Sequence, residues 1–167
     1  MPTEIYQIKI TLLGTKPPIW RRLLVPENMT LARLHKVLQI AMGWTNSHLY
    51  MFQAGREFYS PPDPGDRFMD PSAPTDDRKV RLNQVLESVR AKLIYIYDMG
   101  DSWEHSIVLE KRLPVDLNLK YPVCLGGARA CPPEDCGGIP GFCDLVMAGE
   151  DYDPHAFSVE EVNRSLR

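Results

Sequence analysis

Residues 95–109 read Tyr-Ile-Tyr-Asp-Met-Gly-Asp-Ser-Trp-Glu-His-Ser-Ile-Val-Leu, with two runs rich in β-branched and aromatic residues on either side of a short acidic turn. This pattern predicts an antiparallel β-hairpin at the centre of the chain. Side chains alternate between the two faces of a strand, so Trp103 and His105 share one face and Glu104 lies on the other. We therefore expect His105 to point toward the core or a cleft, away from Glu104.

The patterns on both sides of this hairpin predict a sheet covered by helices. An apolar stripe at helical spacing predicts a helix over residues 30–42, with Thr30 as its N-cap. Ser158 and Glu161 form a capping box before a final helix. The expected fold class is a single α+β domain over residues 1–167, in which a mixed or antiparallel sheet of hairpins packs against a few helices. Further strands are predicted at residues 4–13, 19–25, 48–59, 92–98 and 103–111, and shorter helices at residues 82–89 and 142–147.

Two segments lack such periodicity. Residues 60–79 contain five prolines, which cannot donate to a β-ladder, and we predict a mobile loop there. Residues 113–142 contain five prolines and five glycines and carry three of the four cysteines. Since this composition disfavours helices and strands, we predict an irregular segment over that range.

Composition and the absence of apolar runs limit the class of protein. Of the 167 residues, 44% are apolar and 25% are charged, which is typical of a soluble domain with its own core. No apolar run reaches the length of about 18 residues that marks a transmembrane helix. The first residues have neither the basic region nor the apolar region of a secretory signal. We therefore expect a cytoplasmic protein with no membrane partner.

The central hairpin contains the side chains that are best suited to chemistry. Asp98, Asp101, Glu104 and His105 lie within eight residues of one another. Carboxylates and an imidazole together can hold a divalent metal or act as general acid and base, which suggests a catalytic site. A structural interpretation is equally consistent with the sequence, because turn aspartates accept backbone N–H groups and a buried histidine can bond to a carbonyl.

The four cysteines offer a second candidate metal site. Cys124, Cys131, Cys136 and Cys143 lie within 20 residues, and zinc held by Cys124, Cys131 and Cys136 with His105 would order a loop rich in glycine and proline. The chain has no C-x2-C pair, however, and a cytoplasmic protein keeps its thiols reduced. Buried, reduced cysteines are therefore the alternative.

The basic residues of the chain are concentrated near its beginning. The first 44 residues carry six basic and two acidic side chains, whereas the whole chain has a net charge of −3. A nucleic-acid-binding patch formed by Arg21, Arg22, Arg33 and Lys36 would meet a phosphate backbone. A dipolar surface without any partner is the alternative.

Five motifs spread over the chain are distinctive. They are Ile19-Trp20-Arg21-Arg22-Leu23, Met42-Gly43-Trp44-Thr45-Asn46-Ser47-His48-Leu49-Tyr50-Met51-Phe52, Tyr97-Asp98-Met99-Gly100-Asp101-Ser102-Trp103-Glu104-His105, Cys131-Pro132-Pro133-Glu134-Asp135-Cys136-Gly137-Gly138 and Asp153-Pro154-His155-Ala156-Phe157. Together they resemble the plasmid pRiA4b ORF-3-like family over nearly the whole chain. The chain departs from that pattern at Met99, where an aromatic residue is commoner, and at Cys143, which lies outside it.

The resemblance implies a single α+β domain and an association with plasmids and other mobile elements of bacteria and archaea, and it brings no established activity. It also implies that residues 97–105 and 131–138 belong to one signature, so we expect the second segment to pack over the hairpin turn. The sequence favours a non-enzymatic binding or accessory protein with a protein or nucleic-acid partner. The alternative is a metal-dependent hydrolase that uses Asp98, Asp101 and His105.

Overall fold

The computed structural model describes residues 1–62, 73–149 and 151–167. The mobile loop predicted over residues 60–79 falls mainly on residues 63–72, which lie outside the described residues. In chain order the elements are β1 (Ile5–Leu12), β2 (Ile19–Pro26), α1 (Leu31–Met42), β3 (Tyr50–Ala54), β4 (Glu57–Ser60), β5 (Thr75–Asp76), the 3-10 turn η1 (Asp77–Lys79), α2 (Leu82–Val85), β6 (Lys92–Tyr97), β7 (Trp103–Leu113), β8 (Val123–Ala128), α3 (Gly138–Met147) and α4 (Val159–Leu166).

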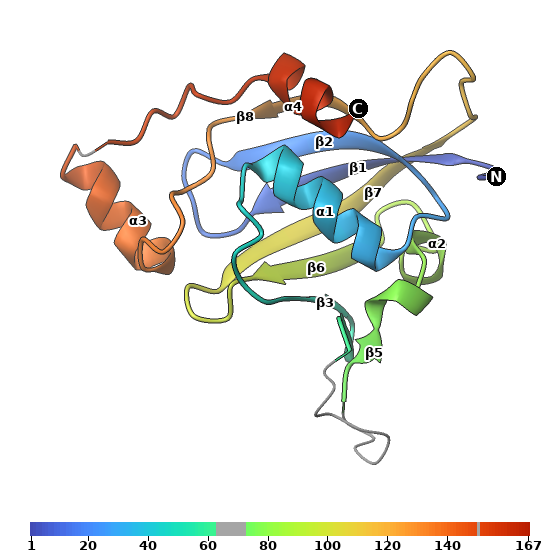
Figure 1. Ribbon diagram of the computed structural model, residues 1–167, viewed down its shortest axis with the longest axis horizontal. Helices are drawn as coiled ribbons and strands as arrows, with labels where there is room; N and C mark the ends of the chain where they lie inside the picture. The colour runs from blue at the N-terminus through green and yellow to red at the C-terminus, as the bar shows by residue number, and fades with distance from the viewer. Residues whose placement is uncertain (63–72, 150) are drawn as a thin grey trace.

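One sheet organises the described part of the chain. Its eight strands follow the order β5-β4-β3-β6-β7-β1-β2-β8 (Figure 1). All neighbouring strands are antiparallel except β4 and β5, which are parallel. The predicted α+β class and the central hairpin, β6 with β7, are both confirmed.

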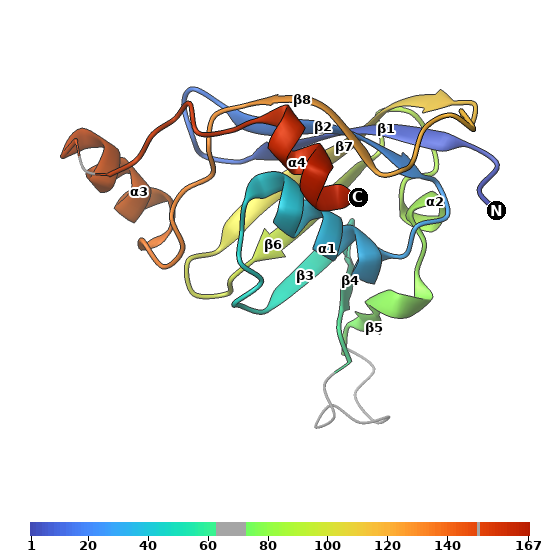
Figure 2. The ribbon, with the colours of Figure 1, turned by 45° about the horizontal axis from the view of Figure 1, so that its top comes forward.

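Helix α1 covers one face of this sheet, and the core lies between the two (Figures 1 and 2). The helix begins as predicted, since the Thr30 side chain accepts a hydrogen bond from the Arg33 amide at 3.2 Å. It ends at Gly43, whose φ of 102° is left-handed and suits glycine. The largest fully buried core side chains include Ile8, Ile10, Leu12, Leu23, Leu31, Phe52, Tyr95, Tyr97 and Trp103.

A closed ring of hydrogen bonds fixes the loop that leaves α1. The Asn46 side-chain oxygen can only accept, so His35 Nε2 carries its hydrogen and donates over 2.7 Å. His35 Nδ1 then accepts from the Tyr95 hydroxyl at 2.7 Å, and burial lowers the pKa of this ring. Gln39 donates to the same hydroxyl and accepts from the Asn46 amide. The loop that leads to His48 is therefore held to the core.

The segment predicted to be irregular, residues 113–142, contains a strand and the beginning of a helix. Strand β8 pairs with β2 although two glycines lie within it, because the neighbouring backbone supplies the order that its own residues lack. A Cβ at Gly127 would lie 2.6 Å from the Trp20 carbonyl oxygen, so only glycine fits this approach. Helix α3 begins earlier than predicted, and α2 is shorter than the helix expected over residues 82–89.

Helix α4 lies beside β8 (Figure 2). Its Asn163 side chain forms hydrogen bonds to the strand. The Asn163 amide oxygen accepts from the Cys124 amide at 2.7 Å, and its nitrogen donates to the Cys124 carbonyl at 2.9 Å. Ser158 caps this helix, as predicted, by accepting from the Glu161 amide.

We expect Asn163→Ala to lower the free energy of unfolding by about 1–2 kcal/mol, because it removes two hydrogen bonds to partly buried backbone groups. Urea-induced unfolding measures the change. Arg164→Ala on the exposed side of the same helix is the matched control and should change the free energy by less than about 0.5 kcal/mol. Equal losses in the two variants would contradict the proposed role of the Asn163 amide.

Candidate functional site

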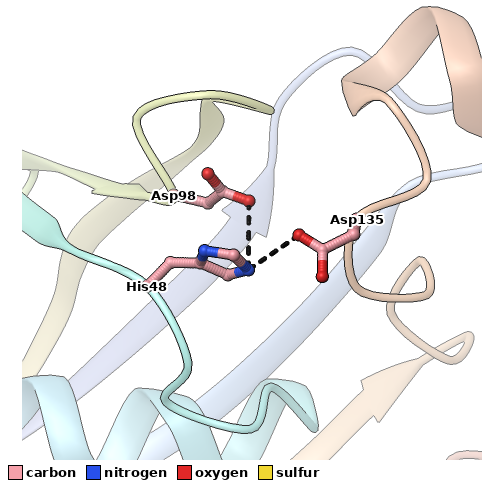
Figure 3. A group of neighbouring side chains, drawn as sticks. All are labelled: His48, Asp98 and Asp135. Atoms are coloured by element: carbon pink, nitrogen blue, oxygen red, sulfur yellow. Dashed lines mark ion pairs between the residues drawn. The ribbon is translucent and has the colours of Figure 1, made fainter.

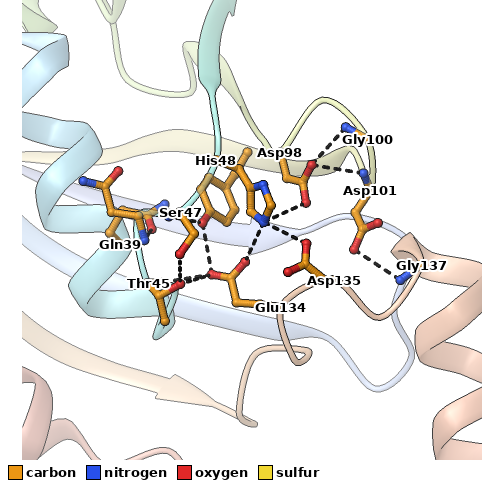
Figure 4. A network of polar contacts seen from close by, with 12 residues as sticks. Gln39, Thr45, Ser47, His48, Asp98, Gly100, Asp101, Glu134, Asp135 and Gly137 are labelled. Atoms are coloured by element: carbon orange, nitrogen blue, oxygen red, sulfur yellow. Dashed lines mark hydrogen bonds and ion pairs between the residues drawn. The ribbon is translucent and has the colours of Figure 1, made fainter.

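Three loops bring a histidine and three carboxylates together at one end of the sheet. Figure 3 shows His48 with Asp98 and Asp135, and Figure 4 also shows Glu134. His48 comes from the loop between α1 and β3, Asp98 from the β6–β7 turn, and Glu134 and Asp135 from the loop between β8 and α3. His48 Nε2 lies 2.8 Å from Asp135 Oδ1, 3.5 Å from Asp98 Oδ2 and 3.7 Å from Glu134 Oε2. One ring nitrogen therefore faces three negatively charged groups.

Asp98 offers one oxygen to the site and uses the other to form the turn. Its Oδ1 accepts from the amides of Gly100 at 2.9 Å and Asp101 at 3.3 Å (Figure 4). Asp98 itself has a φ of 64°, a conformation that aspartate tolerates better than most residues do. Oδ1 therefore has the role expected of a turn aspartate, which is to accept backbone N–H groups. Oδ2 points to His48.

The two carboxylate oxygens of Glu134 also have different roles. Its Oε1 accepts three hydrogen bonds, from the Thr45 amide at 2.8 Å, the Thr45 hydroxyl at 3.0 Å and the Tyr97 hydroxyl at 3.0 Å (Figure 4). Burial, reinforced by Glu134, raises the pKa of Tyr97 to about 12, so this hydroxyl stays protonated and keeps donating. Glu134 Oε2 is shielded from solvent and has no hydrogen-bond partner among the described residues.

The His48 ring nitrogen is also without a hydrogen bond. Nε2 is shielded from solvent, and none of the neighbouring oxygens forms a hydrogen bond of acceptable geometry with it in the described structure. The 2.8 Å contact with Asp135 is therefore a close approach without a hydrogen bond. A buried polar atom without a partner is costly, so two such atoms that face each other form a candidate binding site.

Asp101 joins the β8–α3 loop to the hairpin turn. Its Oδ2 accepts from the Gly137 amide at 3.2 Å. Gly138 has a φ of 70°, and a Cβ there would lie 2.6 Å from the Asp101 carbonyl oxygen, so the two loops touch through their backbones. The expectation that residues 131–138 pack over the hairpin turn is confirmed.

The structure does not bring the predicted catalytic residues together. His105 is fully buried, where Nδ1 donates to the Tyr95 carbonyl at 3.1 Å and Nε2 accepts from Trp44 Nε1 at 3.3 Å. Burial lowers the pKa of His105 to about 4, so the ring is neutral. Glu104 is exposed on the opposite face of β7. Of the four candidates only Asp98 joins the site, and this is a correction to the predicted cluster.

The predicted zinc ligands are likewise separate. Among the described residues, the only group of three or more side chains with metal-ligand spacing is His48, Asp98 and Asp135, so Cys124, Cys131 and Cys136 do not meet His105. Burial raises the pKa of Cys131 to about 12 and also raises the pKa values of Cys124 and Cys136. These thiols therefore stay protonated at neutral pH; Cys124 is buried, and Cys131 and Cys136 are partly buried.

The four predicted nucleic-acid contacts do not form one surface patch. Arg21 is 1% exposed, and its guanidinium donates to backbone carbonyls at the end of α1 and of β8. Arg22 points to the opposite face of the sheet and pairs with Glu110 at 2.7 Å. Arg33 and Lys36 are exposed on α1. Strand alternation separates the two arginines, so the patch predicted from their adjacency is wrong.

Sequence reasoning missed His48, Glu134 and Asp135, although all three lie within the motifs that resemble the family. The signal was available in the joint signature of the hairpin and the Cys131–Gly138 segment, which places Glu134 and Asp135 beside the turn. His48 was assigned to a strand, where it precedes β3, and nothing local marks its direction.

Comparisons with known proteins agree with this architecture. No helix among the described residues is long and apolar enough to cross a membrane. The chain is 40% identical over 164 residues to the uncharacterized protein y4hQ of Sinorhizobium fredii (strain NBRC 101917 / NGR234), covering 96% of this chain and 81% of the relative. It is also similar to the crystal structure of MM3350, a protein of unknown function from Methanosarcina mazei Go1, with a TM-score of 0.82 and 30% identity over 96% of this chain and 97% of that one.

A sequence model described as plasmid pRiA4b ORF-3-like protein matches residues 4–165, which is nearly the whole chain. The match includes every residue of the His48 site and both loops that carry its carboxylates. The chain belongs to the plasmid pRiA4b ORF-3-like family.

Proposed function

We propose that this protein binds one divalent transition-metal ion through His48, Asp98, Glu134 and Asp135. The observation that carries the proposal is the pair of buried, unpartnered donor atoms, His48 Nε2 and Glu134 Oε2, which lie 3.7 Å apart. Each would gain the partner that it lacks by binding a shared cation.

The spacing of the donor atoms supports this proposal. The ligand atoms of His48, Asp98 and Asp135 all lie within 4.8 Å of one another. Two ligands at right angles on an ion with bonds of about 2.1 Å lie about 3 Å apart, and opposite ligands lie about 4.2 Å apart. Shifts of a few tenths of an ångström in side chains at loop tips would therefore complete the coordination.

The surroundings of the carboxylates are those of metal ligands. Asp98 and Glu134 each have one oxygen held by hydrogen bonds, which fixes the direction of the other oxygen. Such outer contacts orient ligands in metal sites and raise their affinity. A single imidazole with carboxylates suits Mn²⁺, Fe²⁺ or Zn²⁺, whereas soft metals prefer thiolates.

The charge of the site supports a binding function over hydrolysis of anionic substrates. Three carboxylates outweigh the two positive charges of the ion, so the loaded site would keep a net negative charge and repel anionic substrates. Of the residues considered for the hydrolase alternative, Asp98 alone belongs to this group. His105 is buried in the core, and the Asp101 side chain accepts a hydrogen bond from the Gly137 amide.

Titration of the full chain with Mn²⁺ tests the proposal, since the sharp electron paramagnetic resonance signal of free Mn²⁺ disappears on binding. The protein is purified without a histidine tag and treated with a chelator first. We expect one Mn²⁺ per chain. His48→Ala should weaken binding at least about a hundredfold, because losing a direct ligand costs more than the loss of an outer contact, which is about 10–100-fold.

His155→Ala is the matched control, because His155 is exposed and outside the site. It should bind Mn²⁺ as the unmodified chain does. Glu134→Gln keeps the shape of the side chain and tests the buried oxygen separately, with weaker binding expected. Absence of stoichiometric Mn²⁺ binding, or equal affinity in His48→Ala and His155→Ala, would overturn the proposed function.

A further inference from the structure

Residues 131–149, which we name the α3 arm, extend from one end of the sheet and carry α3 away from it (Figures 1 and 2). In the described part of the chain, the hydrogen bonds and ion pairs between this arm and other residues are made by Glu134, Asp135 and Gly137. Every one of these polar contacts lies in the His48 site or directly beside it. The polar attachment of the arm is therefore at a single place.

Apolar packing adds a second attachment, in which Phe142 belongs to the hydrophobic core and Cys131, Cys136 and Ile139 pack against it. Phe142 is buried and meets the Tyr152 ring edge to face at 5.0 Å. A Cβ at Gly14 would lie 3.1 Å from the Ile139 side chain, so these two residues are close together. The end of the helix is unpacked, since Val146 is 43% exposed and Met147 is 86% exposed. A helix of 10 residues is too short to be stable without tertiary contacts.

The charges of the site are divided between the body and the arm. We call the sheet with α1 and the turns between its strands the body of the protein. Asp98 belongs to this body, whereas Glu134 and Asp135 belong to the α3 arm. Without a cation the carboxylate of Asp98 and those of Glu134 and Asp135 repel one another, which favours separation of the α3 arm from the body. A divalent cation bound between Asp98 and the two carboxylates of the arm would attract both, so the net interaction between the arm and the body would become favourable.

We infer that metal occupancy of the His48 site fastens the α3 arm to the body of the protein, so that loss of the ion releases the arm. This inference rests on the proposed function and names its regulation: the apolar residues of α3 change their exposure with metal occupancy. The ion joins residues from three loops that the chain connects only through long intervening segments. The loop that leads to His48 and the turn that carries Asp98 are held by their own hydrogen bonds, so the effect of the ion is local to the arm and leaves the α1–sheet core intact.

Hydrogen–deuterium exchange of the full chain, followed by mass spectrometry, tests the inference with Mn²⁺ and with a chelator. We expect amides of residues 137–149 to exchange at least tenfold faster without the ion, whereas amides of α1 and β7 keep their rates. Asp135→Asn is a suitable variant, because the side chain is 69% exposed and asparagine tolerates the φ of 57° at this position. Its arm should exchange faster than that of the Mn²⁺-loaded protein at the same Mn²⁺ concentration.

Mn²⁺ binding is measured by paramagnetic resonance on the same samples, so the two proposals fail separately. Bound Mn²⁺ with an unchanged exchange rate in residues 137–149 would overturn the fastening role and leave the proposed function standing. Absence of bound Mn²⁺ would overturn both. Equal slowing of the arm and of α1 would show general stabilisation and would also overturn the fastening role.

Discussion

Arg21→Met is expected to lower the free energy of unfolding by about 3–5 kcal/mol, because several carbonyls lose hydrogen bonds from a charged donor, each worth about 1.5–3 kcal/mol. The guanidinium donates to the carbonyls of Ala41 at 2.6 Å, Trp20 at 2.8 Å and Arg129 at 2.9 Å, and methionine cannot replace any of these bonds. The carbonyls would then be buried without donors. Its cation also lies at the negative end of α1, where it favours the helix.

Urea-induced unfolding at neutral pH measures this loss. Arg22→Met is the matched control, since Arg22 is the next residue and pairs with a partly exposed Glu110, an interaction worth about 0–1 kcal/mol. Arg21→Lys should fall between the unmodified chain and Arg21→Met, because an ammonium group has fewer donors and cannot span carbonyls from α1 and β8. A loss of less than 1 kcal/mol in Arg21→Met would contradict the structural role.

Acidification is expected to destabilise the protein through His105. The folded-state pKa of His105 is about 4, lowered by burial, whereas an unfolded chain titrates near pH 6.5. Between these values the unfolded chain binds a proton that the folded chain excludes. The stabilising contribution is therefore fully present above about pH 6.5 and is lost as the pH falls toward about 4, to a total on the order of 3 kcal/mol.

Urea-induced unfolding between pH 7 and pH 4 measures this slope. His105→Gln should be less stable than the unmodified chain at pH 7 and should lose less stability on acidification. The lowered pKa of His35 acts in the same direction and remains in that variant. His155→Gln, which replaces an exposed histidine, should keep the original slope. A slope that is the same in His105→Gln and His155→Gln would refute the assignment to His105.

The local elements of the fold could be predicted because their signals are local. The helix over residues 30–42 has a cap, an apolar stripe and a glycine stop within its own sequence. The central hairpin shows alternation on both sides of its turn. Strand β8 has none of these, because its glycines serve the close approach to β2 and the Phe157 ring. Its order comes from the neighbouring strand, so its own composition predicts a loop.

The candidate site could be predicted only in part, because its residues come from three loops. The acidic turn predicts Asp98 as a site residue, and the structure places it there. The same reasoning predicts His105, seven residues further along the chain, but His105 lies in the core. Strand parity placed His105 inward correctly, and the sequence does not show that Trp44 and the Tyr95 carbonyl fill that space. Glu134 and Asp135 approach Asp98 because Gly138 allows backbone contact with the turn, a relation that no single motif contains.

The two hydrogen bonds from Asn163 to Cys124 have a consequence for assembly. An edge strand presents free amide and carbonyl groups, and another chain can add to the sheet by pairing with them. At Cys124 the outward amide and carbonyl are already bonded to a side chain of the same molecule. The Asn163 amide thus imitates the backbone of a further strand at this position, and a second molecule cannot pair with Cys124 while these bonds are made.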